Sequence, residues 1–133
     1  MAYRLDIVTP ELTLFSGEVR HLRVPGTEGS FGALAGHVPM LAAMKVGCLD
    51  FIQEGHGEFQ VATSGGFVEV QREQVTVLAE TAEFATEIDM ERAQAARDRA
   101  LERLADDEHE IDEVRAKLAL NRALNRLRIS QAS

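Results

Sequence analysis

The sequence changes character at residues 88–93, Ile88-Asp89-Met90-Glu91-Arg92-Ala93. Before this hexapeptide, short alternating segments are separated by glycine and proline, which is typical of strands and turns. After it, residues 94–133 contain no glycine, proline or aromatic residue, which favours helices. A near copy, Ile111-Asp112-Glu113-Val114-Arg115-Ala116, begins a second helical pattern. The chain is therefore predicted to be α+β in two parts, residues 1–86 and 87–133.

The first part is predicted to be an antiparallel β-sandwich. Alternating segments end at Thr9-Pro10, Ser16-Gly17 and Pro25-Gly26 and give three strands: 3–8, 12–15 and 19–24. Two hairpins follow, one joining 48–52 to 59–63 and one joining 67–70 to 75–78. Eight to ten strands are expected in all, and two packed sheets can bury such a set. No helical stretch lies between them that could serve as a parallel crossover.

The second part is predicted to be an antiparallel helical hairpin. Apolar residues recur at spacings of three and four in two runs, separated by Asp106-Asp107-Glu108-His109. Each run predicts a helix of about 18 residues, and the short polar link favours antiparallel neighbours. The first run is rich in alanine, which buries little area per residue. This composition is typical of a weakly docked, moving element, or equally of alanine chosen for helix propensity.

Composition excludes several classes of protein. The net charge of −8 argues against nucleic-acid binding. The single cysteine, Cys48, excludes an intramolecular disulfide and a multi-cysteine zinc site. No apolar run approaches the roughly 20 residues of a membrane span, and no secretory signal is visible, so any membrane contact is expected to go through a partner. Four scattered histidines and no paired carboxylates or nucleophile set predict neither a metal site nor an enzyme.

The hexapeptide at 88–93 admits two interpretations. In the first, Thr86 caps the helix and Asp89 forms a surface ion pair with Arg92. In the second, Arg92 and Arg99, seven residues apart on one helix face, meet Arg122 or Arg126 from the other helix. Such a set of guanidinium groups could hold a polyphosphate.

Two further segments are candidate interaction surfaces. The loop and strand around His37-Val38-Pro39-Met40-Leu41 are apolar and contain a flexible methionine, so this segment would be a docking surface if it were exposed. Residues 114–133 contain five basic side chains and no acidic one: Arg115, Lys117, Arg122, Arg126 and Arg128. This segment is either a solvated helix face or a basic surface for an acidic partner.

Several segments together resemble the ε subunit of the rotary F-type ATP synthase. They are Gly32-Ala33-Leu34-Ala35-Gly36-His37-Val38-Pro39-Met40-Leu41, Ser64-Gly65-Gly66-Phe67-Val68-Glu69-Val70, Val75-Thr76-Val77-Leu78-Ala79-Glu80 and Ile88-Asp89-Met90-Glu91-Arg92-Ala93. The resemblance covers the full length. It implies a ten-stranded sandwich and a helical hairpin in the central stalk, with the γ subunit, the c-ring and the catalytic α and β subunits as partners. It also implies a peripheral position on the cytoplasmic face of a bacterial plasma membrane.

The resemblance further implies a non-catalytic subunit that couples rotation to ATP synthesis. The segment His37, Val38, Pro39, Met40 and Leu41 resembles the part of the family that faces the c-ring and γ. The tail of the family folds down as a hairpin or extends upward along γ and blocks ATP hydrolysis.

Some bacterial members of the family bind ATP, alone or with Mg, as a regulatory ligand and require no cofactor. Their motif, Ile/Leu-Asp-x-x-Arg-Ala, is matched by residues 88–93. The family contacts map onto eight residues here: Glu83, Ile88, Asp89, Arg92, Ala93, Arg99, Arg122 and Arg126. Two alternatives stay open, namely the same stalk subunit without ATP sensing, and a non-enzymatic β-sandwich adaptor with a helical tail.

Overall fold

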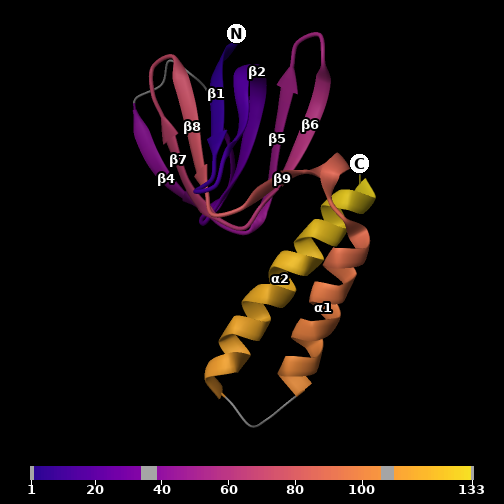
Figure 1. Cartoon of the computed structure of the whole chain (residues 1–133). Coiled ribbons are helices and arrows are strands. Elements are labelled where there is room, and N and C mark those ends of the chain that lie inside the picture. The colour runs from indigo at the N-terminus through magenta and orange to yellow at the C-terminus, as the bar shows by residue number, and fades with distance from the viewer. Residues whose placement is uncertain (1, 34–38, 106–109, 133) are drawn as a thin grey trace. The chain divides into compact units, whose positions relative to one another are not determined.

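The computed structural model describes residues 2–33, 39–105 and 110–132 and divides the chain into two units (Figure 1). The first unit is Met1–Phe84 and the second is Ala85–Ser133. The described residues of the first unit form strands only, apart from turns, and those of the second form helices. The predicted sandwich followed by a helical hairpin is therefore confirmed.

Nine strands make up the described part of the first unit. They are β1 (Tyr3–Val8), β2 (Thr13–Gly26), β3 (Gly29–Ala33), β4 (Met40–Met44), β5 (Gly47–Gln53), β6 (Gly57–Thr63), β7 (Gly66–Val70), β8 (Gln74–Ala79) and β9 (Ala82–Phe84). Their order is β1-β8-β7-β4-β2-β5-β6-β9, with β3 on β2. Because β2 pairs with β1 near its start and with β4 and β5 near its end, it takes part in both layers. Every pairing is antiparallel except that of β1 with β8, which is parallel.

The core lies between the layers because side chains alternate along each strand. On β1, Leu5 and Ile7 are fully buried, whereas Arg4, which directly precedes Leu5, is exposed. Aromatic rings continue the core toward β9, since the centroids of Phe51 and Phe59 are 5.5 Å apart and those of Phe59 and Phe84 are 5.9 Å apart. At roughly 25 cal/mol per Å² of apolar surface, this burial is the main stabilising contribution to the unit.

The predicted break at Ser16-Gly17 is wrong, because β2 runs without interruption from Thr13 to Gly26. Gly17 stays in the ladder opposite Leu5 of β1. A Cβ atom on Gly17 would lie 3.1 Å from Gln53 Nε2 and 3.2 Å from the Phe15 ring. This glycine therefore permits a close side-chain approach and does not make a turn.

A β-bulge bends β2 in its second half. The register against β5 shifts between Arg20 and Arg23, and His21 has a φ of 55°, which few non-glycine residues adopt. The backbone N–H of Leu22 donates instead to the Tyr3 hydroxyl, at 3.1 Å. Burial raises the pKa of Tyr3, while this hydrogen bond lowers it by a smaller amount. The Tyr3 hydroxyl thus satisfies a backbone donor that the bulge leaves inside the core.

Replacing Tyr3 by phenylalanine is expected to lower the free energy of unfolding by about 1–3 kcal/mol. The substitution keeps the buried ring but leaves the Leu22 N–H without its acceptor. Urea unfolding at neutral pH, followed by circular dichroism, measures the change. A loss below about 0.5 kcal/mol, the range of ordinary surface substitutions, would contradict this role for the hydroxyl.

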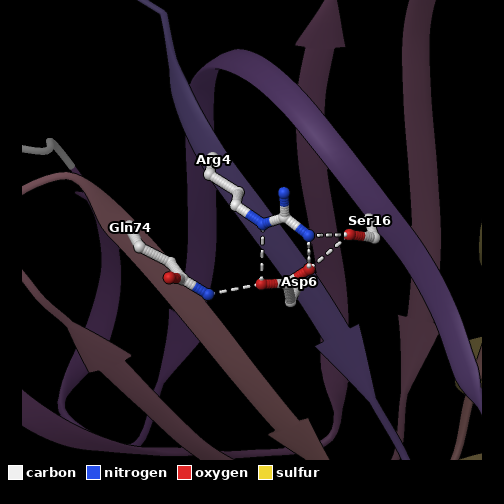
Figure 2. A network of polar contacts seen from close by, with 4 residues as sticks. All are labelled: Arg4, Asp6, Ser16 and Gln74. Atoms are coloured by element: carbon white, nitrogen blue, oxygen red, sulfur yellow. Dashed lines mark hydrogen bonds and ion pairs between the residues drawn. The ribbon is translucent and has the colours of Figure 1, made fainter.

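A polar network joins β1, β2 and β8 on the outside of the sheet (Figure 2). The Asp6 carboxylate accepts hydrogen bonds from Ser16 Oγ at 2.5 Å, from Arg4 Nε at 3.3 Å and from Gln74 Nε2. Arg4 Nη2 also donates to Ser16 Oγ at 2.7 Å. The Ser16 hydrogen bond lowers the pKa of Asp6 most, Arg4 and Gln74 lower it further, and partial burial opposes them.

The network predicts the direction in which the stability of the folded chain changes with pH. Because the pKa of Asp6 is lower in the folded chain, its stabilisation is fully present above the ordinary aspartate value of about 3.9 and is lost as the pH falls through the folded pKa. Asp6→Asn should therefore be less stable than the wild type at pH 7, and the difference should shrink below about pH 4. Urea unfolding at pH 7 and pH 3 measures both differences, and an equal difference at the two pH values would refute the prediction. Ser16→Ala should show a smaller effect in the same direction.

The second unit begins with a short 3-10 turn, η1 (Ala85–Glu87), followed by α1 (Met90–Ala105) and α2 (Glu110–Ala132). The two α-helices lie side by side and antiparallel (Figure 1). They have 16 and 23 residues, so α2 is longer than predicted. The predicted break at residues 106–109 lies outside the described residues. Four alanines are buried where the helices meet: Ala93, Ala100, Ala116 and Ala123.

Candidate functional site

The start of α1 is fixed by Asp89. Its carboxylate Oδ1 accepts a hydrogen bond from the backbone N–H of Arg92 at 3.2 Å, and its carbonyl accepts one from Ala93 N at 3.0 Å. Asp89 is therefore the N-cap, and the predicted cap by Thr86 is wrong. Thr86 lies in η1, and it is separated from the N-cap Asp89 by Glu87 and by Ile88, which is 9% exposed.

The predicted surface ion pair between Asp89 and Arg92 is also wrong. In the part of the chain that the structure describes, Asp89 bonds the backbone of Arg92 and no ion pair reaches its guanidinium. The Asp89 carboxylate is used for capping, because there it accepts a hydrogen bond from a backbone N–H in the first turn that would otherwise have no partner. The exposed Arg92 side chain is thereby left available to another acceptor.

Three arginines share one face of α1. Arg92, Arg99 and Arg103 are spaced by seven and four residues, which places them within about 40° of one another at 100° per residue. Arg92 and Arg99 each directly precede a buried alanine of the interface. The three side chains therefore lie beside the α1–α2 contact.

The same pattern recurs on α2. Arg115, Arg122 and Arg126 have the same spacing, and the first two again directly precede buried alanines, Ala116 and Ala123. Two antiparallel helices that contact each other through equivalent positions are related by a two-fold axis perpendicular to the plane that contains both helix axes. Rotation about this axis exchanges the helices but keeps each side of that plane in place. Both sets of arginines therefore lie on the same side of the hairpin.

The six residues on this side are called the arginine face: Arg92, Arg99, Arg103, Arg115, Arg122 and Arg126. Among the described residues, no ion pair reaches any of the first five. Away from this face, Arg97 pairs with Asp98 at 3.0 Å and Lys117 with Glu113 at 3.2 Å. Several guanidinium groups without acidic partners on one surface favour a multiply charged anion, which they can bind with bidentate hydrogen bonds.

The structure thus brings together four of the predicted ligand contacts: Arg92, Arg99, Arg122 and Arg126. Sequence reasoning missed Arg103 and Arg115, although the repeated spacing in both helices is a visible signal. Glu83 lies in the first unit, half-buried on β9 opposite Ala62, and stays a predicted member of the site. Ile88, Asp89 and Ala93 hold the start of α1, and their role toward a ligand also stays a prediction.

The predicted docking segment is described only in part. His37 and Val38 lie outside the described residues, while Pro39 is exposed. Met40 and Leu41 on β4 are 42% and 67% exposed and line a cavity of ≈ 370 Å³ together with Phe31. Met40 and Leu41 are therefore accessible, and docking there stays a prediction, whereas Met44 at the other end of the strand belongs to the core.

Within the described residues, neither α1 nor α2 combines the length and the apolar character that crossing a bilayer requires. Both helices carry charged side chains throughout their length.

Comparison with known proteins gives the family. Residues 2–85 match the beta-sandwich domain of the ATP synthase Delta/Epsilon chain, and residues 86–131 match its long alpha-helix domain. The ATP synthase epsilon chain of Desulforamulus reducens is 52% identical over 101 residues, which are 76% of each chain. That of Alkalihalophilus pseudofirmus is 46% identical over 76% of this chain and 75% of its own.

Solved structures agree with the sequence relatives. A chain in the cryo-EM structure of the Euglena gracilis mitochondrial ATP synthase, OSCP/F1/c-ring, is similar with a TM-score of 0.74 and 25% identity, covering 88% of this chain and 74% of that chain. A Tetrahymena thermophila central stalk/c-ring chain, at 13% identity and a TM-score of 0.53, shares the fold. The protein therefore belongs to the ATP synthase Delta/Epsilon chain family as an epsilon chain, a non-catalytic subunit of the synthase.

Proposed function

We propose that this epsilon chain is a rotor subunit of the central stalk, which couples proton-driven rotation to ATP synthesis. Its partners are the γ subunit, the c-ring and the catalytic α and β subunits, and it sits peripherally on the cytoplasmic face of a bacterial membrane. Its bacterial relatives and the similar Euglena gracilis chain, solved with F1 and the c-ring, support this placement. The exposed Met40 and Leu41 on β4 support a protein contact there.

The helical unit acts as a brake on ATP hydrolysis. Opened end to end, α1 and α2 together span about 58 Å at 1.5 Å per residue, without counting the link. The α2 segment from Val114 onward carries five basic residues and no acidic one. In the extended state this segment would contact acidic surface of the catalytic subunits and oppose hydrolytic rotation.

The alanine contacts between the two helices contribute little free energy, as a switch requires. Ala93, Ala100, Ala116 and Ala123 each contribute a single methyl group, while Leu127 and Ile129 of α2 are buried as well. At about 0.8 kcal/mol per buried methyl or methylene, the four together contribute about 3 kcal/mol. These weak contacts favour closed and open states that are close enough in free energy for a ligand to choose between them.

ATP bound on the arginine face holds the hairpin closed and releases the brake. The arginine face, with five guanidinium groups lacking ion-pair partners among the described residues, is the observation that carries this proposal. It is complete only when both helices lie together, so the ligand binds the closed state selectively. ATP at a hundred times its dissociation constant contributes about 2.7 kcal/mol to that state, which matches the alanine contribution in size.

Co-purification from the native host tests the stalk assignment. An affinity tag on the chain should bring down a γ subunit, the catalytic subunits and a membrane c-ring in stoichiometric amounts. Recovery of the tagged chain alone, or with proteins that are not synthase subunits, would refute the assignment. The adaptor alternative predicts the latter result.

A further inference from the structure

The second helix repeats the sequence of the first at a constant offset of 23 residues. Residues 88–105 and 111–128 are identical at ten of their eighteen aligned positions. The repeat includes the whole arginine face, because Arg92, Arg99 and Arg103 align in that order with Arg115, Arg122 and Arg126. The hexapeptide motif is therefore part of a longer duplication. The proposed ATP site gives a role to the first copy of this motif and leaves the second copy without one.

The antiparallel hairpin groups the arginines differently from the sequence. The buried alanines of the interface are seven residues apart in each helix. Because the helices run in opposite directions, Ala93 lies at the same height along the hairpin as Ala123, and Ala100 at the same height as Ala116. Three arginines therefore lie at about the height of Ala93, and the other three at about the height of Ala100.

These two groups contain residues from both helices. They are called the first triad, Arg92, Arg122 and Arg126, and the second triad, Arg99, Arg103 and Arg115. At 1.5 Å per residue, the members of each triad lie within about 6 Å of one another along the helix axes, and the centres of the triads are about 14 Å apart. The arginine face thus consists of two similar cationic surfaces at different heights.

The second triad is exposed and lacks acidic partners among the described residues. None of its three guanidinium groups takes part in an ion pair there. Asp98 and Glu113 are each paired with another cation, at 3.0 and 3.2 Å. Glu102 precedes Arg103 directly and lies about 100° from it around the helix. The second triad therefore has a positive potential that favours an anion with several oxygens.

We propose that the second triad binds an inorganic phosphate ion while ATP occupies the first triad. Arg103 of α1 and Arg115 of α2 hold the phosphate from the two helices. Arg99 is the member of the second triad nearest to the first and contributes to both ligands. Inorganic phosphate is consumed in ATP synthesis, so the helical unit responds to two reactants of the synthase. This regulatory consequence rests on the proposed function, in which a ligand on the arginine face keeps the hairpin closed.

The chemistry of the second triad fits phosphate. A phosphate group carries about −1.5 to −2 charges at pH 7 and has several acceptor oxygens, so it can bind more than one guanidinium. A carboxylate has a single charge and two oxygens, which one arginine already satisfies. The separation of about 14 Å between the triads exceeds the Debye length of about 8 Å at physiological ionic strength, so the two anions repel each other only weakly.

Both ligands require the closed hairpin, because each triad combines arginines from α1 and α2. By linkage, each ligand should then bind at least as tightly in the presence of the other. Competition would give the opposite result, since two anions that share one site exclude each other. The effect of ATP on the affinity for phosphate therefore distinguishes a second site from a single shared one.

Titration of the ¹⁵N-labelled full chain with sodium phosphate, followed by nuclear magnetic resonance, tests the second site. It is carried out with and without saturating ATP, and sodium chloride keeps the ionic strength constant. Saturable shifts of the amide signals around Arg103 and Arg115 are expected in both cases. Arg103→Gln and Arg115→Gln should each weaken phosphate binding by about tenfold or more, as expected for the loss of a hydrogen bond to a charged group. Arg97→Gln is the matched control and should bind phosphate like the wild type, because Arg97 is paired with Asp98.

The outcomes separate this inference from the proposed function. If phosphate binds at Arg103 and Arg115 but ATP does not bind, the proposed ATP regulation is wrong and the phosphate site stands. If ATP binds but phosphate does not saturate, or its apparent dissociation constant rises in proportion to the ATP concentration, only the phosphate site is wrong. Equal phosphate affinity of the wild type and both glutamine variants would also refute the site. Glutamine favours helices almost as well as arginine, and circular dichroism should show that the helices of each variant are unchanged.

Discussion

Removing residues 88–133 is expected to leave the synthase assembled and to raise its rate of ATP hydrolysis. The deletion removes α1 and α2 but leaves all nine described strands of the sandwich intact. The proposed brake is a contact between the basic α2 segment and acidic catalytic subunits, so the blocked state loses its stabilisation. If that contact favours the blocked state by about 1.4 kcal/mol, hydrolysis should rise by about tenfold.

A charge variant distinguishes the brake from a general effect of truncation. Replacing Lys117 and Arg128 by glutamine should raise hydrolysis in the same direction, because both belong to the segment without acidic residues and neither belongs to the arginine face. Arg97→Gln on α1 should leave the rate unchanged, since Arg97 is already paired with Asp98 at 3.0 Å. Steady-state ATPase activity of purified complexes measures all three. An unchanged rate after deletion would eliminate the brake for this protein.

Arg92→Ala and Arg122→Ala are each expected to weaken ATP binding to the isolated chain by about ten- to a hundredfold. The two residues contribute to the arginine face from different helices, and hydrogen bonds to charged groups contribute about 1.5–3 kcal/mol each. Loss of either side chain should therefore weaken binding although the hairpin still forms. Equilibrium titration followed by fluorescence or calorimetry measures the dissociation constants.

Two further variants delimit the arginine face. Arg97→Ala is the matched control, because Arg97 lies on α1 but is paired with Asp98 and stands off this face. Its affinity for ATP should equal that of the wild type. Arg115→Ala should weaken binding if the whole face contributes, whereas a site limited to the sequence motif would leave it unaffected. An unaltered affinity of Arg92→Ala would show that any ATP binds elsewhere.

The sequence predicted the architecture because alternation and helical periodicity are local signals. The hairpins β5–β6 and β7–β8 and the two helices follow directly from them. Gly17 was misinterpreted because a glycine that permits a close contact and a glycine that makes a turn look alike in a sequence. The contact that decides between them is with Gln53, far along the chain. The parallel pairing of β1 with β8 depends in the same way on a long-range contact.

The sequence predicted which residues belong to the candidate site, but it did not predict how they are arranged in space. The spacing of Arg92 and Arg99 shows that they share a helix face, yet it does not show on which side of the hairpin that face lies. Burial of Ala93 and Ala123 identifies the interface and so fixes the side. Asp89 was expected to pair with the Arg92 side chain, whereas it caps the helix through the Arg92 backbone. The choice between these partners depends on where the first helical turn begins, which the sequence places only to within a few residues.

Calorimetric titration of the isolated wild-type chain with ATP tests the central claim, that the closed hairpin binds the nucleotide on its arginine face. A nucleotide site on the closed hairpin should give a saturable heat with one site per chain and a dissociation constant below the millimolar range. The same titration of Arg92→Ala should give little or no saturable heat. Absence of saturable binding by the wild type at millimolar ATP would show that the closed hairpin is not a nucleotide site.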